Sequence, residues 1–284
     1  MDPAIFLTII INGLCTGGVY GVVASAFTFQ LGALRIVNFS YGAFLMLAMF
    51  AVFIIATKGQ LPLTVAAVLC IPVFAAFGWA LRRFLIPASN DNIQILMTMG
   101  ILIIFENLAL FIWGSFPRSL SVIEDGIYLG SIYIGVNRLA LLVLSAVILL
   151  GVHLFLTRTW LGMAIRAMVQ SKDAALVVGV NVDRIGTLAF GFSSGLVAIA
   201  AALLMTLFSV EPMSGGYYLL IAFLVAVIGG MGNLWGSFLG GLIIGVISAL
   251  AIFFSPGLHD VVLFVAFVLT LLIRPYGIFG LKEG

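Results

Sequence analysis

The sequence predicts an all-α polytopic membrane protein, a bundle of about nine transmembrane helices, and three observations support this. Hydrophobic residues make up 64% of the 284 residues and charged residues only 8%, whereas soluble domains have about 45–50% and about 25%. The chain contains a series of mainly apolar stretches of the length that a crossing helix needs, about 20 residues. Lipid offers the backbone no hydrogen-bond partners, so these stretches should be helical.

The predicted spans follow one another along the whole chain. We expect them at about 5–31, 39–57, 62–81, 93–114, 138–157, 185–208, 216–230, 235–254 and 257–273. The seventh is short, so nine is the best count within a range of eight to ten. The two cysteines, Cys15 and Cys70, fall inside apolar stretches and are expected to be small core residues rather than metal ligands.

Basic residues indicate the orientation, because cytoplasmic loops are enriched in Lys and Arg. With the N-terminus outside, nine of the twelve Lys and Arg residues fall in internal segments and three in external ones. The internal ones are Arg35, Arg82, Arg83, Arg158, Arg166, Lys172, Arg184, Arg274 and Lys282, and the external ones are Lys58, Arg118 and Arg138. We therefore expect an external N-terminus and a cytoplasmic C-terminus. The long external connection 115–137 is glycine-rich and is expected to form a short hairpin or cap.

Two regions of the chain look alike. One starts at Gly17 and the other at Gly215; each begins Gly-Gly-x-Tyr, turns through a glycine-rich link and returns with Gly-x-Phe-Leu. Both would run in the same direction across the membrane, so we interpret them as a parallel repeat with halves 5–81 and 212–274 in a single transmembrane domain, 1–284. Chance similarity between glycine-rich helices is the alternative.

Glycines recur at helical spacing in both regions. Gly13, Gly17 and Gly21 share one face of the first span, as do Gly236 and Gly240 in a later one. Small residues at this spacing let helix backbones approach closely in a membrane, so helix packing is the expected role. A second interpretation is that the helices slide along these glycine contacts when a pathway opens. The links 32–38 and 229–232 could be re-entrant breaks.

Residues 158–184 form the largest predicted cytoplasmic loop and have helical patterning. Ile165, Met168 and Val169 share one face, while Arg166, Gln170 and Asp173 share another. Ser171 could begin a second short helix that Gly179 ends. We expect a helix–turn–helix at the membrane surface, which is either a basic hairpin that anchors topology or a docking element for a cytoplasmic protein.

The motifs of this loop and of two other segments resemble a known family. The loop reads Gly162-x-x-x-Arg166-Ala167, then Asp173 and Gly179-Val180-Asn181-x-x-Arg184; the others read Ile36-Val37-Asn38-Phe39-Ser40-Tyr41-Gly42 and Ile228-Gly229-Gly230-Met231-Gly232-Asn233. Together they resemble permease subunits of bacterial ABC importers, and specifically the high-affinity branched-chain amino acid family. Many relatives have a small residue followed by histidine or glutamine where this chain has Ser40-Tyr41, so the exact substrate stays open.

The resemblance implies a transport subunit and not an enzyme. It implies a multi-pass protein of the bacterial inner membrane that forms a pathway with a second related permease, whether an identical or a different chain, and receives substrate from a periplasmic binding protein. Two cytoplasmic ATPase subunits would bind ATP, and this chain has neither a cofactor of its own nor a phosphate-binding loop. The residues implied in ATPase coupling are Arg166, Ala167, Asp173, Ala174, Gly179 and Asn181.

Polar residues in or near the spans are candidates for the pathway or a gate. They are Asn12, Thr16, Asn38, Tyr41, Glu106, Ser193 and Glu211. Glu106 stands out, because a charge near the bilayer centre costs at least about 2.5–3.5 kcal/mol and is usually functional. Each candidate also has a purely structural interpretation. This is hydrogen bonding between helices or, for Glu211, a position in an ordinary loop. We identify no catalytic or metal-binding residues.

Other functions are less consistent with the sequence. A urea or short-chain amide permease shares these motifs and stays an alternative. An ion-coupled secondary transporter would need several intramembrane charges, a channel would need a repeated filter, and a membrane enzyme would need clustered His, Asp or Glu.

Overall fold

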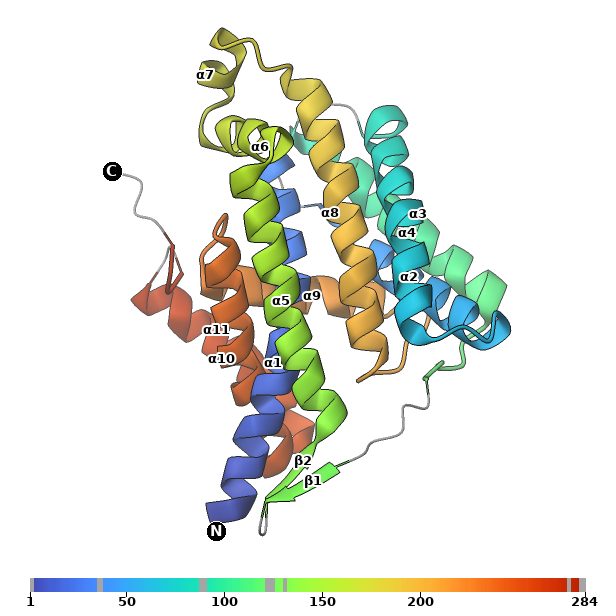
Figure 1. Cartoon of the computed structure of the whole chain (residues 1–284), viewed down its shortest axis with the longest axis vertical. Helices are drawn as coiled ribbons and strands as arrows, with labels where there is room; N and C mark the ends of the chain where they lie inside the picture. The colour runs from blue at the N-terminus through green and yellow to red at the C-terminus, as the bar shows by residue number, and fades with distance from the viewer. Residues whose placement is uncertain are drawn as a thin grey trace. The chain divides into compact units, whose positions relative to one another are not determined.

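The computed structural model describes residues 3–34, 38–86, 91–120, 126–129, 132–274 and 277–280 (Figure 1). It confirms an all-α membrane bundle. The long helices are α1 (Pro3–Leu34), α2 (Ser40–Lys58), α3 (Leu63–Phe84), α4 (Asp91–Trp113), α5 (Val136–Arg158), α8 (Val182–Met205), α9 (Gly215–Gly229), α10 (Leu234–Phe254) and α11 (His259–Ile273). Short elements are α6 (Trp160–Gln170), α7 (Lys172–Val177) and the 3₁₀ helix η1 (Pro256–Leu258). Arg35, Ile36, Val37 and Lys282 lie outside the described residues.

Eight helical segments in the described part are long and apolar enough to cross a membrane. They match eight of the nine predicted spans. The ninth, predicted at 216–230, forms α9, which has only 15 residues. At 1.5 Å per residue this helix is about 22 Å long, short of a hydrocarbon core of about 30 Å. The supported count is therefore eight candidate spans and one shorter apolar helix.

The hairpin predicted within 115–137 is confirmed. Strand β1 (Gly126–Leu129) pairs antiparallel with β2 (Ile132–Gly135), and Tyr128 lies opposite Tyr133. A further backbone bridge joins the two connections that follow α4 and α8, where Arg118 and Val210 exchange two N–H···O bonds of 2.8 Å.

The chain divides into two compact units. The first comprises Met1–Thr28, Val122–Gly151 and Ile221–Gly284, and the second comprises Phe29–Ser121 and Val152–Leu220. In the second unit α2 packs against α3, α4 and α8. Phe44 of α2 lies at the centre of this packing, with ring centroids 5.3 Å from Phe77, 6.0 Å from Phe105 and 6.3 Å from Phe190. One aromatic side chain from each of the four helices therefore meets in one cluster.

In the first unit, α1 and α10 are in backbone contact. A methyl group at Gly17 would lie 2.6 Å from the carbonyl oxygen of Gly241 and 2.8 Å from Cα of Leu242. Further along, the hydroxyls of Thr28 and Ser237 are 2.7 Å apart and form a buried hydrogen bond. Glycine at position 17 leaves no side chain between the helices, which permits this close crossing.

The remaining glycines of the predicted packing set occupy similar places. Gly13 lies against Val246, and Gly21 lies against Phe238. Gly236 and Gly240 face α9, where a methyl group at Gly240 would lie 2.9 Å from Cα of Gly229.

Replacing Gly17 by alanine tests the α1–α10 contact. Gly17→Ala should lower the free energy of unfolding, because overpacking a tight contact costs about 1–3 kcal/mol. Gly100→Ala on α4 is the matched control, since a methyl group there meets nothing within 4 Å. It should leave stability unchanged or raise it slightly. Thermal unfolding of the detergent-solubilised variants measures both; equal shifts in the two would contradict the contact.

Candidate functional site

Residues 158–184 form the predicted helix–turn–helix. The hydroxyl of Thr159 accepts the N–H of Gly162 at 3.0 Å and so caps the start of α6. Ile165 and Met168 are buried on one side of α6, whereas Arg166 is exposed on the other. A methyl group at Gly162 would lie 2.5 Å from Cα of Leu156. The helix α6 therefore packs directly against the end of α5 and presents Arg166 to solvent.

The second helix of this loop, α7, ends at Val177, and Gly179 follows as the predicted stop. Gly179 has a left-handed φ of +82°. Its N–H donates to the carbonyl of Leu176 at 3.0 Å, and the N–H of Val180 donates to Ala175 at 2.9 Å. These two bonds form a Schellman motif, which satisfies the last carbonyls of the helix.

The tip of the loop carries an exposed apolar run. Leu176, Val177 and Val178 are 58%, 87% and 74% exposed. A fixed apolar surface of this kind at the end of a capped helix is typical of an interaction site. Composition alone did not single it out, because three aliphatic residues in a short helix are usually buried.

The next residue of the implied coupling set, Asn181, begins α8. Its side-chain oxygen accepts the N–H of Arg184 at 3.0 Å. The six residues of the set thus occupy one continuous element: Arg166 and Ala167 on α6, Asp173 and Ala174 on α7, and Gly179 and Asn181 in the connection to α8.

Glu106 lies against the first residues of α9. Its Oε1 accepts the N–H of Gly216 at 3.0 Å. Glu106 is about two turns before Trp113, the end of α4, which corresponds to about 10 Å. The helix α9 therefore begins beside α4, about two turns before the end of α4. A carboxylate at this place satisfies a free N–H and complements the positive end of the helix dipole.

The first residues of α9 also touch α2. Gly42 and Gly215 are in direct contact, and a methyl group at Gly215 would lie 2.9 Å from Oε1 of Glu106. The adjacent Tyr41 is fully buried at 0% exposure. It packs inside the unit in this conformation and lines no open surface.

Asn38 organises the start of α2. Its Nδ2 donates to Oε1 of Gln30 at 2.9 Å, and its Oδ1 accepts both the N–H and the hydroxyl of Ser40, at 3.1 and 2.7 Å. The N–H of Phe39 donates to the hydroxyl of Thr98 at 3.3 Å. Sequence reasoning missed Thr98; its spacing of four residues from Gln94, which is also buried, was the signal available.

The other pathway candidates are not gathered at one point. Asn12 and Thr16 are partly exposed on α1 and belong to the first unit, whereas Ser193 is fully buried on α8 in the second. Glu211 is exposed in the connection before α9.

A chain of hydrogen bonds with the connectivity of a hydrolase triad links α10 to α11. The Ser248 hydroxyl is 2.8 Å from Nε2 of His259, whose Nδ1 is 2.9 Å from Oδ1 of Asp260. Ser248 is only 3% exposed inside α10, so a substrate carbonyl cannot reach it. The three side chains hold the turn between the two helices together.

The comparisons with known proteins agree with the motifs. The family described as "Branched-chain amino acid transport system / permease component" matches residues 9–271. The chain is 29% identical to the high-affinity branched-chain amino acid transport system permease protein BraD of Pseudomonas aeruginosa, over 98% of this chain and 97% of that protein. It is 28% identical to the corresponding permease protein LivH of Escherichia coli, over 98% and 96%.

A solved structure shares the fold. The structure titled "PsaBC from Streptococcus pneumoniae in complex with Fab" aligns with a TM-score of 0.53 and 14% identity, over 93% of this chain and 91% of that chain. The family match covers most of the sequence and agrees with the multi-span helical fold. The chain therefore belongs to the family of permease components of branched-chain amino acid ABC transport systems, non-catalytic membrane subunits that work with ATPase and binding-protein partners.

Proposed function

We propose that this permease receives its driving force through residues 158–184, which dock two cytoplasmic ATPase subunits. The exposed run Leu176–Val178 carries the proposal, because it offers an ATPase an apolar surface on the same helix–turn–helix as the exposed cation Arg166. Hydrophobic contact would supply affinity, and the charge would supply specificity. ATP binds to the partner subunits and not to this chain.

The local geometry supports transmission of force from this loop. The helices α6, α7 and α8 are each ended or started by a capping interaction, at Thr159, Gly179 and Asn181. The helix α8 continues into the bundle and packs against α2 and α3. A displacement of the loop would therefore move α8 against its neighbours, which is the mechanical form of coupling between two sites.

We infer that the N-terminus is external, that 158–184 is cytoplasmic, and that the membrane is a bacterial inner membrane. The proposed parallel repeat, with halves 5–81 and 212–274 in one domain, has local support. In both copies an asparagine precedes the returning helix: Asn38 accepts from Ser40 before α2, and Asn233 accepts the N–H of Gly236 at 3.1 Å before α10. Asn233 is the N-cap of α10, whereas Asn38 lies one residue before Phe39, the N-cap of α2. An asparagine close to the start of each returning helix supports duplication of a helical hairpin.

The proposed cargo is a branched-chain amino acid delivered by a periplasmic binding protein, with a second related permease completing the pathway. Asn12, Thr16 and Ser193 offer amide and hydroxyl groups that would hold a zwitterion weakly, and Glu211 would lie at the outer mouth. Glu106 accepts a backbone hydrogen bond, which favours a positioning role over the proton relay that an ion-coupled transporter needs. A urea or short-chain amide is the alternative cargo.

Charge reversal in the loop tests the docking proposal. Arg166→Glu or Asp173→Lys should leave the protein inserted but reduce both ATPase co-purification and ATP-driven uptake by more than tenfold. Arg118→Glu is the control, because this exposed arginine lies in the connection after α4 and should not change ATPase co-purification. Normal uptake by the Arg166 and Asp173 variants would refute the docking role.

Thiol labelling tests the orientation. Both native cysteines are buried, so an introduced exposed cysteine should dominate the signal. Expressed without partner subunits, Val177→Cys should react with a membrane-impermeant maleimide only after spheroplasts are permeabilised. Phe116→Cys, at a position 74% exposed in the connection after α4, should react in intact spheroplasts. The opposite pattern would reverse the proposed topology.

Two substitutions separate the roles of Glu106. Glu106→Leu removes the acceptor for the Gly216 N–H and should lower the free energy of unfolding by about 1.5–3 kcal/mol. Glu106→Gln keeps an acceptor oxygen and should lower it less. For a positioning role, uptake per folded molecule should fall more with Leu than with Gln. Loss of uptake in both variants at unchanged thermal stability would instead indicate proton transfer.

A further inference from the structure

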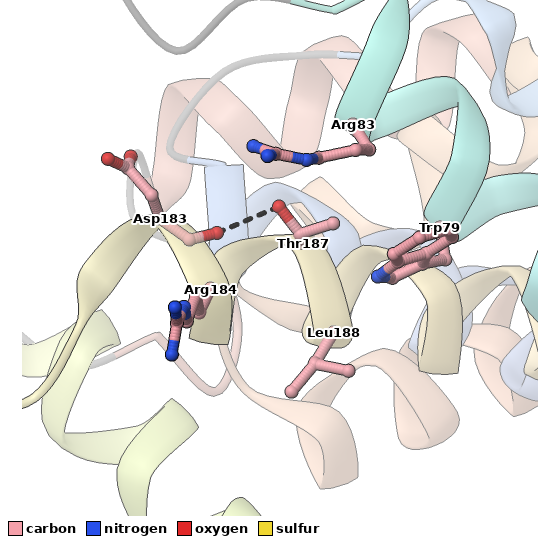
Figure 2. A pocket seen from close by; sticks show the side chains of 6 residues that line it. All are labelled: Trp79, Arg83, Asp183, Arg184, Thr187 and Leu188. Carbon is pink, nitrogen blue, oxygen red and sulfur yellow. Dashed lines mark hydrogen bonds between the residues drawn. The ribbon is translucent and has the colours of Figure 1, made fainter.

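A pocket of about 330 Å³ opens where α3 ends and α8 begins (Figure 2). Trp79 and Arg83 line it from α3, and Thr187 and Leu188 line it from α8. Two residues of the first turn of α8 complete the lining, Asp183 and Arg184. The pocket belongs entirely to the second unit. Asp183 and Arg184 also end the proposed docking loop 158–184, but the exposed run Leu176–Val178 that carries the docking proposal is not part of the lining.

The charges of the pocket favour an anion. Arg83 and Arg184 are both exposed, and among the described residues neither makes an ion pair. Asp183 is the one acidic lining residue, and Figure 2 shows its carboxylate pointing away from Thr187. The adjacent Arg82 adds a third guanidinium near Asp183; it donates to the carbonyl of Ile86 at 2.5 Å. The local charge is therefore positive.

The other half of the lining is apolar and exposed. Trp79 and Leu188 are each 43% exposed, and the neighbouring Phe84 is 75% exposed. These residues lie at the ends of two candidate spans, Leu63–Phe84 and Val182–Met205. Tryptophan is enriched at the level of the lipid headgroups. The pocket thus lies at the membrane surface, where charged and apolar ligand parts meet.

We propose that this pocket binds the headgroup of an anionic phospholipid. Guanidinium groups bind phosphate oxygens through paired hydrogen bonds, and basic pockets between transmembrane helices are suited to acidic headgroups. The phosphate accepts from the guanidinium groups of Arg83 and Arg184, and the Arg184 side chain, which points away from Arg83 in Figure 2, turns toward it on binding. The acyl chains follow the apolar surface of Trp79 and Leu188 into the bilayer. The Thr187 hydroxyl donates to the backbone of Asp183 at 2.8 Å and is free to accept.

A bound lipid of this kind would join two helices that move relative to one another in the proposed mechanism. Arg83 is on α3, while Arg184 is in the first turn of α8, directly after the Asn181 cap. The lipid therefore stabilises the arrangement of α3 and α8 in which both arginines reach one phosphate. Anionic lipid composition becomes a determinant of stability for this conformation.

The experiment compares purified permease in nanodiscs of phosphatidylglycerol and of phosphatidylcholine. Native mass spectrometry counts retained lipid, and thermal unfolding measures stabilisation. The wild type should retain phosphatidylglycerol selectively and unfold at a higher temperature in it. Arg83→Gln and Arg184→Gln should each weaken retention about fivefold, and the double variant should lose the difference between the two lipids. The double Arg→Lys variant, which keeps both charges, should retain part of it.

Arg158→Gln is the matched control, because this exposed arginine ends α5 and does not line the pocket. Equal loss of retention in this control would overturn the proposal, since any surface charge would then suffice. Stabilisation by inorganic phosphate in phosphatidylcholine discs to the same extent would assign the pocket to a free anion instead. Loss of ATPase co-purification in the double Gln variant at unchanged lipid retention would make the pocket a protein contact, which also contradicts the lipid site.

Discussion

The structure depends on one constraint: lipid offers no hydrogen-bond partners, so every backbone N–H and C=O group within the membrane must be satisfied by the protein. A helix that stops inside the bilayer leaves N–H or C=O groups that lipid cannot satisfy, so each interruption needs a partner from the protein. The interruptions have such partners: Glu106 receives the Gly216 N–H at the start of α9, and Asn38 and Asn233 receive N–H groups before α2 and α10. At these three helix starts, a specific side chain therefore supports the backbone.

The same constraint explains the use of glycine. Hydrophobic attraction between helices is weak in lipid, so close packing and hydrogen bonds must supply the association energy. In the first unit, Gly17 and Gly241 bring α1 and α10 into backbone contact, and the Thr28–Ser237 bond lies further along these helices. In the second, Gly42 and Gly215 allow α2 to reach the start of α9 beside Glu106. Close approach and polar bonding thus occur together.

The sequence predicts a structural feature well when residues close together in the chain determine it, and poorly when residues far apart in the chain do. The span predicted at 39–57 is Ser40–Lys58, and the helix stop at Gly179 is correct, because both follow from local composition and backbone preference. The short seventh segment predicted at 216–230 forms α9, Gly215–Gly229, but its contact with Glu106, a residue 110 positions away, could not be read from local sequence. The pocket between Arg83 and Arg184 likewise joins distant segments. Orientation and the repeat depend on patterns in the chain alone and stay predictions.

Helix starts held by single side chains, together with close glycine contacts, are suited to a subunit that its partners move. A helix end held by one carboxylate or one amide is well defined, yet each such bond contributes only about 1–3 kcal/mol. A hydrogen bond of this strength is enough to hold the helix end in one arrangement. It is also no larger than a typical allosteric coupling free energy, about 1–3 kcal/mol, so such a coupling could break it. The helix α9 is the clearest case, since it has 15 residues and a single carboxylate at its first turn. A movement of α4 that withdrew Glu106 would free this turn, so α9 is the element whose position the proposed ATP-driven motion could most readily change.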